Sequence, residues 1–311
     1  MNEPAAHGST MRRLLAYAGE RFPLAAYLPM ILLAAGAAIG YSRVARDAPG
    51  FSPPATFLVT AFTLLAAFFA LRVADEHKDA DVDRVTRPEL PVPRGLVTLR
   101  ELRVAASVLA MAALVANGLL SPVLLVPLAG VALWLTLMTR EFFAREWLRG
   151  QPAVYLASHM VIMPLLLLYA TATDWMTAGA GAPRSLWLFL AASYATGLVL
   201  EIGRKIRSPG EERPGVETYT ESWGRPRAVT AWLASVAASA TLIVLTAVAV
   251  RATWTPVAAP LLAIGVSFAA WRFLRADPAA RVGKQIELAS AVWTLGAYVL
   301  LALPWIERTL A

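Results

Sequence analysis

Long apolar segments recur along the whole chain of 311 residues, and they constrain its fold more than any other feature. An α-helix needs about 20 residues to cross the ~30 Å hydrocarbon core of a bilayer. The segments that are long and apolar enough lie at approximately 23–43, 53–74, 97–117, 121–138, 153–173, 185–203, 227–249, 255–272 and 284–304. The sequence therefore predicts an all-α, polytopic membrane bundle of about nine transmembrane helices.

The composition also favours a membrane protein over a soluble one. Hydrophobic residues make up 58% of the chain and charged residues 16%, against roughly 45–50% and about 25% in soluble domains. The breaks between apolar segments are too short for linkers between domains, so we expect residues 1–311 to form a single integral membrane domain. The first span is too long for a signal-peptide core and no small-residue cleavage site stands at the right place, so we expect the N-terminal stretch to stay attached. The absence of cysteine excludes a disulfide framework, a thiolate metal site and a cysteine nucleophile.

The basic residues predict the orientation of the chain. Lys and Arg number 28 against 21 Asp and Glu, an excess that would suggest nucleic acid in a soluble protein. With the N-terminus in the cytoplasm, 23 of the 28 basic residues lie on the cytoplasmic side, as the positive-inside rule predicts. The exceptions are Arg43, Arg46, Arg184, Arg251 and Arg308. We therefore expect a protein of the bacterial inner (plasma) membrane that binds no nucleic acid, with its N-terminus and charged loops cytoplasmic.

Two charged loops, at about 75–96 and 201–226, are where we expect the chemistry of this protein. If the second span continues as a helix, Asp75, Asp79 and Asp83 fall at i, i+4 and i+8 and share one face. A divalent cation would relieve their repulsion, and Mg²⁺ is usually held by one or two carboxylates together with substrate phosphates. The alternative is a solvated helix end that is neutralised by the nearby basic residues Lys78, Arg84 and Arg87.

A stiff, proline-rich turn follows the three aspartates. It reads Thr-Arg-Pro-Glu-Leu-Pro-Val-Pro-Arg-Gly over residues 86–95 and carries two arginines, whose guanidinium groups can hold phosphate in a bidentate manner. At this point the chain resembles the UbiA superfamily of intramembrane prenyltransferases, whose signature is N/D-D/E-x-x-D-x-x-x-D followed by an R-P…P-x-G turn. The matching residues are Asp75, Glu76, Asp79, Asp83, Arg87, Pro88, Pro91 and Gly95.

The resemblance covers nearly the whole chain, through the nine spans and the charged loop after the sixth span. It implies a helical bundle with a lateral opening to lipid, in which Mg²⁺ on acidic residues binds an isoprenyl diphosphate and promotes its ionisation. The implied metal ligands are Asp75, Glu76, Asp79 and Asp83, and Asp75 and Asp79 are also expected to be catalytic. Two acids of the second loop, Glu211 and Glu212, are further candidate metal ligands, although they are not part of the family motif. The groups expected to bind diphosphate are Arg72, Lys78, Arg87, Arg94, Arg140, Arg204, Lys205 and Arg207.

The second loop departs from the family, because most members carry a further D-x-x-x-D on helix six. Residues 200–205 read Leu-Glu-Ile-Gly-Arg-Lys, and laid over residues 71–76 (Leu-Arg-Val-Ala-Asp-Glu) they form a weak internal repeat with the charges reversed. We hypothesise that Arg204, Lys205 and Arg207 contact diphosphate oxygens directly and replace the second metal cluster. The alternative is that these basic residues only mark a cytoplasmic boundary.

Breaking an allylic carbon–oxygen bond leaves diphosphate and an allyl cation, which needs an apolar chamber that excludes water. Ring faces stabilise such a cation. His159 is an ionisable group within a span, and we expect it to remove a proton from an acceptor or from the carbocation. The alternatives are a histidine that hydrogen-bonds between helices, and aromatic residues that face lipid or pack. The predicted substrate pocket contains Tyr155, His159, Tyr194 and Tyr219, and further aromatic candidates are Trp134, Phe142, Phe143 and Tyr169.

The turn after the fourth span also departs from the family, which usually offers a Tyr and a Lys there. This chain has Arg140, a candidate phosphate contact, followed by Glu141, which fits the family pattern less easily. The resemblance therefore implies a Mg²⁺-dependent prenyltransferase that acts on an isoprenyl diphosphate in the bilayer, and we expect a small, aromatic acceptor. The alternatives are a UbiA-type terpene cyclase acting on farnesyl or geranylgeranyl diphosphate, and a cation-coupled transporter. A transporter fits less well because transport sites lie near the bilayer midplane, whereas this acidic stripe lies at a helix end.

Overall fold

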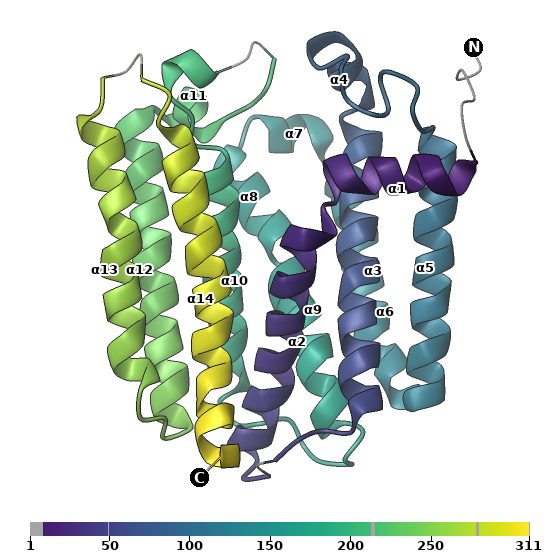
Figure 1. Ribbon diagram of the computed structural model, residues 1–311, viewed down its shortest axis with the longest axis vertical. Helices are drawn as coiled ribbons and strands as arrows, with labels where there is room; N and C mark the ends of the chain where they lie inside the picture. The colour runs from purple at the N-terminus through teal and green to yellow at the C-terminus, as the bar shows by residue number, and fades with distance from the viewer. Residues whose placement is uncertain (1–8, 49, 213–214, 278–279, 311) are drawn as a thin grey trace.

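Helices that can cross a membrane make up most of the molecule (Figure 1). The computed structural model describes residues 9–48, 50–212, 215–277 and 280–310. Within these residues, 9 helical segments are long and apolar enough to span a bilayer and no strand is formed, which confirms the predicted bundle. Arg213, one of the basic residues that the topology argument places in the cytoplasm, lies outside the described residues.

Each span corresponds to one predicted segment. The spans are α2 (Leu24–Ala45), α3 (Pro54–Lys78), α5 (Leu99–Leu120), α6 (Leu125–Thr139) with the preceding turn η1 (Pro122–Leu124), α8 (Pro152–Met160) together with α9 (Ile162–Trp175), α10 (Leu186–Arg204), α12 (Arg225–Ala249), α13 (Thr255–Arg275) and α14 (Gly283–Leu310). The shorter elements are α1 (Thr10–Arg21), α4 (Ala80–Thr86), η2 (Glu141–Phe143), α7 (Arg145–Arg149), η3 (Pro209–Glu211) and α11 (Tyr219–Trp223).

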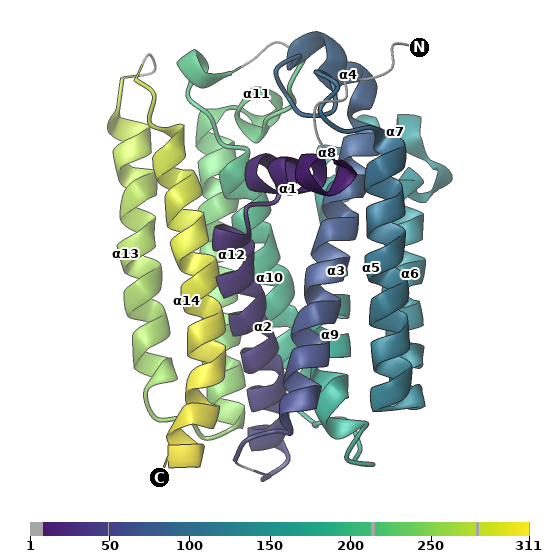
Figure 2. The ribbon, with the colours of Figure 1, turned by 45° about the vertical axis from the view of Figure 1, so that its right-hand side comes forward.

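The short elements α1, α4, α7 and α11 gather at one end of the bundle, uppermost in Figures 1 and 2. The C-terminus lies at the other end. We call the upper end the motif end, because it carries both charged loops. Residues that are far apart in the sequence, at the end of α3 and at the end of α10, are thus brought to the same end of the molecule.

The spans pack through small residues and paired polar groups. A Cβ at Gly203 would lie 1.8 Å from the Ser290 hydroxyl oxygen, so α10 approaches α14 more closely than any other residue would permit. Trp232 donates its indole N–H to Ser290 over 2.8 Å, and Trp293 donates to Ser239 over 3.2 Å. Helices in lipid associate through this combination of close packing and interhelical hydrogen bonds. The small residues of α10 therefore hold the motif end of this helix within the bundle.

The fifth span is interrupted, although the sequence predicts one segment over 153–173. Its first part, α8, ends at Met160, and α9 begins at Ile162. Pro164 explains the interruption, because it has no N–H to bond to the Met160 carbonyl and its ring clashes with that carbonyl. The break separates α8, which carries Tyr155 and His159, from the remainder of the span.

The helix α1 lies crosswise over the motif end and was not expected from the sequence (Figures 1 and 2). Tyr17 on this helix is fully buried against the bundle, the apolar side chains of Met11 and Leu15 are exposed, and so are the charged residues Arg12 and Glu20. The Ser9 hydroxyl accepts the Arg12 N–H and caps its N-terminus. A helix of this kind lies in the plane of a membrane interface instead of crossing it.

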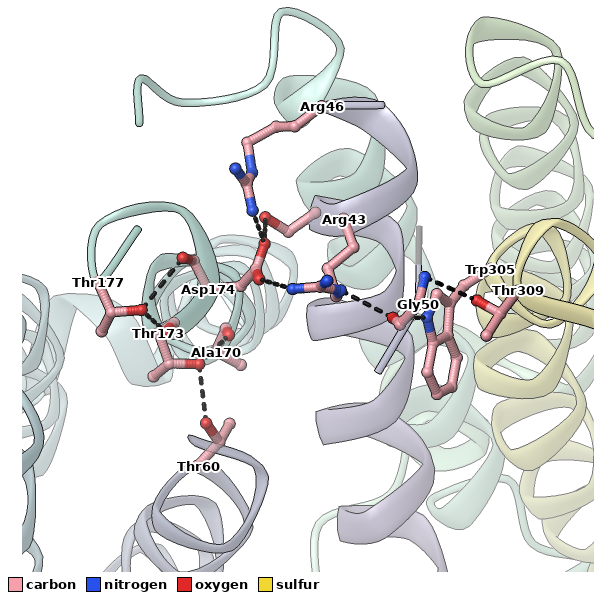
Figure 3. Close-up of polar contacts among 11 residues, drawn as sticks. Arg43, Arg46, Gly50, Thr60, Ala170, Thr173, Asp174, Thr177, Trp305 and Thr309 are labelled. Carbon is pink, nitrogen blue, oxygen red and sulfur yellow. Dashed lines mark hydrogen bonds and ion pairs between the residues drawn. The ribbon is translucent and has the colours of Figure 1, made fainter. Parts of the chain in front are cut away.

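A network of ion pairs ties the helices together at the end opposite the motif end (Figure 3). Asp174 is buried at the end of α9 and accepts from Arg43 over 3.1 Å, from Arg46 over 2.6 Å and from the Ser42 hydroxyl over 2.7 Å. Arg43 and Arg46 are two of the basic residues that the topology argument places outside. Their pairing with Asp174 gives them a structural role at this end of the bundle.

Candidate functional site

The first acidic motif lies where α3 gives way to α4. Asp75 is in the last turn of α3, and Asp79 is the residue between the two helices, with φ −91° and ψ 0°. The predicted continuous helix through Asp83 is therefore interrupted at Asp79. Asp75 and Asp79 still lie one turn apart, since the Asp79 N–H donates to the Asp75 carbonyl over 2.9 Å.

Asp75 and Asp79 are half-buried carboxylates that form no hydrogen bond or ion pair with any described residue. Burial, and next the charge of Asp75, raise the pKa of Asp79 above its usual value. Two such carboxylates, one turn apart and mutually repelling, suit a divalent cation, which would relieve both the repulsion and the desolvation. Within the described residues, no three His, Cys, Asp or Glu side chains are arranged to hold a metal by themselves. A cation here would need further oxygen ligands from a substrate or from water.

The other two acids of the motif are engaged in ion pairs. Glu76 is only 2% exposed and lies 2.8 Å from the Arg21 guanidinium and 3.4 Å from that of Arg72. Asp83 is equally buried and pairs with Arg87 one turn later. The structure thus joins two predicted metal ligands to two predicted phosphate-binding arginines, and these charges neutralise one another in this state.

The second charged loop begins at the end of α10 with a compact cluster of opposite charges. Glu201 is buried and pairs with Arg204 and, over 3.1 Å, with Lys205. The Lys205 ammonium also lies 5.5 Å above the ring of Tyr219, so α11 folds back over the end of α10. Arg204 remains 46% exposed in its side chain and lies close enough to Asp75 for the two charges to interact. Of the reversed charges in the internal repeat, Asp75 and Arg204 therefore interact across the motif end, whereas Glu201 pairs within its own segment.

The remaining predicted groups of this loop stabilise the loop itself. Glu211 accepts the backbone N–H groups of Ser208 and Gly283, each over 2.9 Å. Glu212 accepts the hydroxyl groups of two threonines, and Arg207 pairs with Glu287 over 3.0 Å. Glu211 and Arg207 anchor the loop to the beginning of α14, whereas Glu212 stabilises the segment before α11. The predicted roles of these side chains toward metal and diphosphate stay predictions.

Two further predicted phosphate-binding arginines lie at the surface. Arg94 donates to Glu20 of α1 over 2.9 Å, and this hydrogen bond lowers the pKa of Glu20. Arg140 is exposed between α6 and η2. Neither arginine is brought to Asp75 or Asp79 by a contact that the structure describes.

An aromatic cluster on α8 stands beside the acidic motif. Tyr155 stacks on His159 with ring centroids 3.8 Å apart, and Phe142 meets His159 edge to face at 5.8 Å. Lys78, from the last turn of α3, donates to the Tyr155 hydroxyl and pairs with Glu141 over 2.9 Å. Asp75 acts electrostatically on Tyr155. The structure therefore brings two of the predicted pocket residues next to the predicted catalytic carboxylates.

The other aromatic candidates take different positions. The Tyr194 hydroxyl donates to the Ala157 carbonyl over 3.0 Å. Tyr194 therefore contacts α8 away from the face that carries Tyr155 and His159. Tyr219 stacks on Trp223, and burial raises its pKa, so it remains a neutral phenol. Trp134 packs edge to face against Phe142. Phe143 is exposed, and Tyr169 is fully buried and hydrogen-bonded to Asn117 of α5.

Three residues, Arg21, Glu141 and Glu201, pair with predicted site residues but were not themselves predicted from the sequence. Glu201 precedes Arg204 and Lys205 by three and four residues, a helical spacing that could have revealed its ion pairs. No local pattern marks the contact of Arg21 with Glu76 or that of Glu141 with Lys78, because each joins segments that are distant in the sequence.

Comparisons with known proteins identify the family and the fold of the chain. A sequence model of the UbiA prenyltransferase family matches residues 33–291. Among solved structures, an apo UbiA homologue from Aeropyrum pernix K1 is similar with a TM-score of 0.63 and 16% identity, over 90% of this chain and 97% of that one. A digeranylgeranylglyceryl phosphate synthase is similar with a TM-score of 0.60 and 16% identity, over 94% of this chain and 99% of the other. At these identities the structural similarity concerns the fold alone.

No curated protein sequence matches the chain. The family model nevertheless covers most of the chain, from within α2 to within α14, and includes both charged loops. The chain therefore belongs to the UbiA prenyltransferase family.

Proposed function

We propose that the protein is a Mg²⁺-dependent intramembrane prenyltransferase that ionises an isoprenyl diphosphate and transfers the prenyl group to a small, aromatic acceptor. The observation that carries the proposal is the juxtaposition of the unpaired Asp75 and Asp79 with the partly exposed Arg204 at the motif end. This arrangement supports a site in which the carboxylates bind a metal and the basic groups bind an anion, close to the Tyr155 that Lys78 contacts.

The proposed division of labour follows from charge. Asp75 and Asp79 would hold Mg²⁺, which when bound supplies positive charge to the leaving diphosphate. Arg204 and Lys205 contact diphosphate oxygens, and they are already oriented by their ion pairs with Glu201. When the carbon–oxygen bond breaks, its electron pair leaves with the diphosphate and an allyl cation remains. The rings of Tyr155 and His159 stabilise this cation and exclude water.

His159 is the proposed base for the proton that the acceptor loses. Its Nδ1 lies 2.9 Å from the Tyr155 carbonyl oxygen, which can only accept, so Nδ1 carries the hydrogen in the neutral ring. Nε2 is then unprotonated and can take a proton from the alkylated acceptor. The acceptor forms a bond with the cationic prenyl carbon and loses one proton, which His159 takes up at Nε2.

The orientation of the site is part of the proposal. The positive-inside rule favours a cytoplasmic motif end and N-terminus in a bacterial inner membrane, because this end carries the two basic loops. Since the chain contains no cysteine, a single introduced cysteine is the only thiol of the protein that a labelling reagent can modify. The cysteine of Arg84→Cys should react with a membrane-impermeant thiol reagent only after the membrane is permeabilised. The cysteine of Asp47→Cys should react with the same reagent in intact cells.

The function is tested with purified protein, Mg²⁺ and farnesyl or geranylgeranyl diphosphate, by measuring diphosphate release and identifying products by mass spectrometry. Release that requires both Mg²⁺ and an added aromatic acceptor supports the transferase. A cyclic hydrocarbon formed without any acceptor identifies a terpene cyclase, the second candidate, which the stacked aromatic rings beside the acidic motif also suit. No turnover of either diphosphate with any acceptor would contradict both.

A further inference from the structure

Three consecutive residues between α6 and α7 adopt the left-handed conformation. The φ angles of Glu141, Phe142 and Phe143 are 48°, 51° and 58°. This conformation costs about 1–2 kcal/mol for each residue with a side chain, and no glycine is present here. Such backbone strain persists only where the surrounding structure maintains it, and it is found most often at functional sites.

The left-handed turn places a buried carboxylate next to α3. Glu141 is 5% exposed, and its Oε1 lies 2.9 Å from the Lys78 ammonium. Its Oε2 lies 3.0 Å from the guanidinium of Arg145, whose side chain is more than half exposed. Phe142 packs against the rings of Trp134 and His159 and holds the turn in place.

Lys78 occupies a critical place in the acidic motif. It follows Asp75 by three residues and directly precedes Asp79, and its charge acts on Asp79. At this helical spacing a lysine readily forms an ion pair with an aspartate. In the structure it does not, because its ammonium group bonds instead to Glu141 and to the Tyr155 hydroxyl. Asp75 and Asp79 are left without an ion pair as a result.

We propose that Glu141 is a positioning residue that holds Lys78 away from Asp75 and Asp79 and so keeps these carboxylates free for a divalent cation. The inference rests on the proposed function, because it takes Asp75 and Asp79 as the metal ligands. Glu141 then strengthens metal binding without touching the metal. The left-handed turn is the backbone path that brings this carboxylate from the α6–α7 connection to Lys78.

The test measures Mn²⁺ binding to the full-length protein without substrate, from the electron paramagnetic resonance signal of free Mn²⁺. Glu141→Gln keeps the shape of the side chain but removes its charge, so Lys78 turns to the aspartates and the dissociation constant rises about tenfold. Adding Lys78→Met removes the competing ammonium group and restores the affinity of the wild type. Arg145→Gln is the matched control, because it breaks the ion pair between Arg145 and Glu141 but keeps the ion pair between Lys78 and Glu141.

The outcomes separate the inference from the proposed function. A wild type that binds no Mn²⁺ overturns the metal role of Asp75 and Asp79, and the inference with it. If the wild type and Glu141→Gln bind Mn²⁺ equally well, the inference alone is overturned. It is also overturned if Glu141→Gln binds Mn²⁺ more weakly and the added Lys78→Met does not restore the affinity. Should Glu141→Gln not fold, Glu141→Asp takes its place: its charge is retained but its reach is shorter, so weaker Mn²⁺ binding is expected and unchanged binding overturns the inference.

Discussion

The ion pair between Arg21 and Glu76 fastens α1 to the acidic motif, and its removal should destabilise the protein measurably. Glu76 is 2% exposed, and the Arg21 guanidinium lies 2.8 Å from its Oε1. Removing one partner of a buried pair typically costs about 3–5 kcal/mol, because the other charge is left buried and uncompensated. Arg72 remains 3.4 Å from the same oxygen, so we expect Arg21→Met to lie at the lower end, about 3 kcal/mol.

This loss of unfolding free energy, divided by the unfolding entropy of a globular chain of this length, corresponds to a decrease in Tm of about 5 °C. The assay is thermal unfolding in detergent, followed by the fluorescence of the 10 tryptophans. Arg12→Met is the matched control, since Arg12 lies exposed on the same helix. Adding Glu76→Gln to Arg21→Met should recover at least about 1 kcal/mol, the coupling expected between residues in contact. Equal Tm values for the two single arginine variants would refute the reasoning.

Three further predictions concern the proposed reaction. Asp75→Ala and Asp79→Ala should each abolish Mg²⁺-dependent diphosphate release while leaving Tm almost unchanged. The control Asp81→Ala, which alters an exposed aspartate in the same segment, should remain active. Near-normal turnover by both site variants would reject the metal assignment. Lys205→Asp should sharply weaken diphosphate binding, because the new charge repels phosphate, and unchanged affinity over a range of Mg²⁺ concentrations would remove Lys205 from the site. His159→Ala should slow acceptor alkylation in a transferase, whereas in a cyclase it should change the product mixture; normal rates with unchanged products would exclude His159 as the base.

The spans could be predicted from the sequence because the signal for them is local. Crossing a bilayer requires a continuous apolar run, and each of the predicted segments overlaps one span of the structure. The helix α1 was missed because it is a short amphipathic segment that lies across the motif end and does not cross the bilayer. The break at Val161 was readable from Pro164, whose consequence for the backbone is also local.

The candidate site was only partly accessible from the sequence. Asp75 and Asp79 were identified because the spacing of the motif puts them one turn apart, and the structure leaves their carboxylates unpaired. The same spacing could not show that Glu76 is neutralised by Arg21. It also could not show that Lys78 turns toward Glu141 instead of the neighbouring aspartates.

The class of fold and the position of the acidic motif follow from the sequence alone, and the basic residues predict the direction of the chain through the membrane. The pairing of the charges, in contrast, depends on the folded structure. A buried charge must find a partner, and the sequence offers several arginines and several acids that could pair with one another. The packing of distant helices selects among these pairings, and in this chain it leaves Asp75, Asp79 and part of Arg204 available at the motif end.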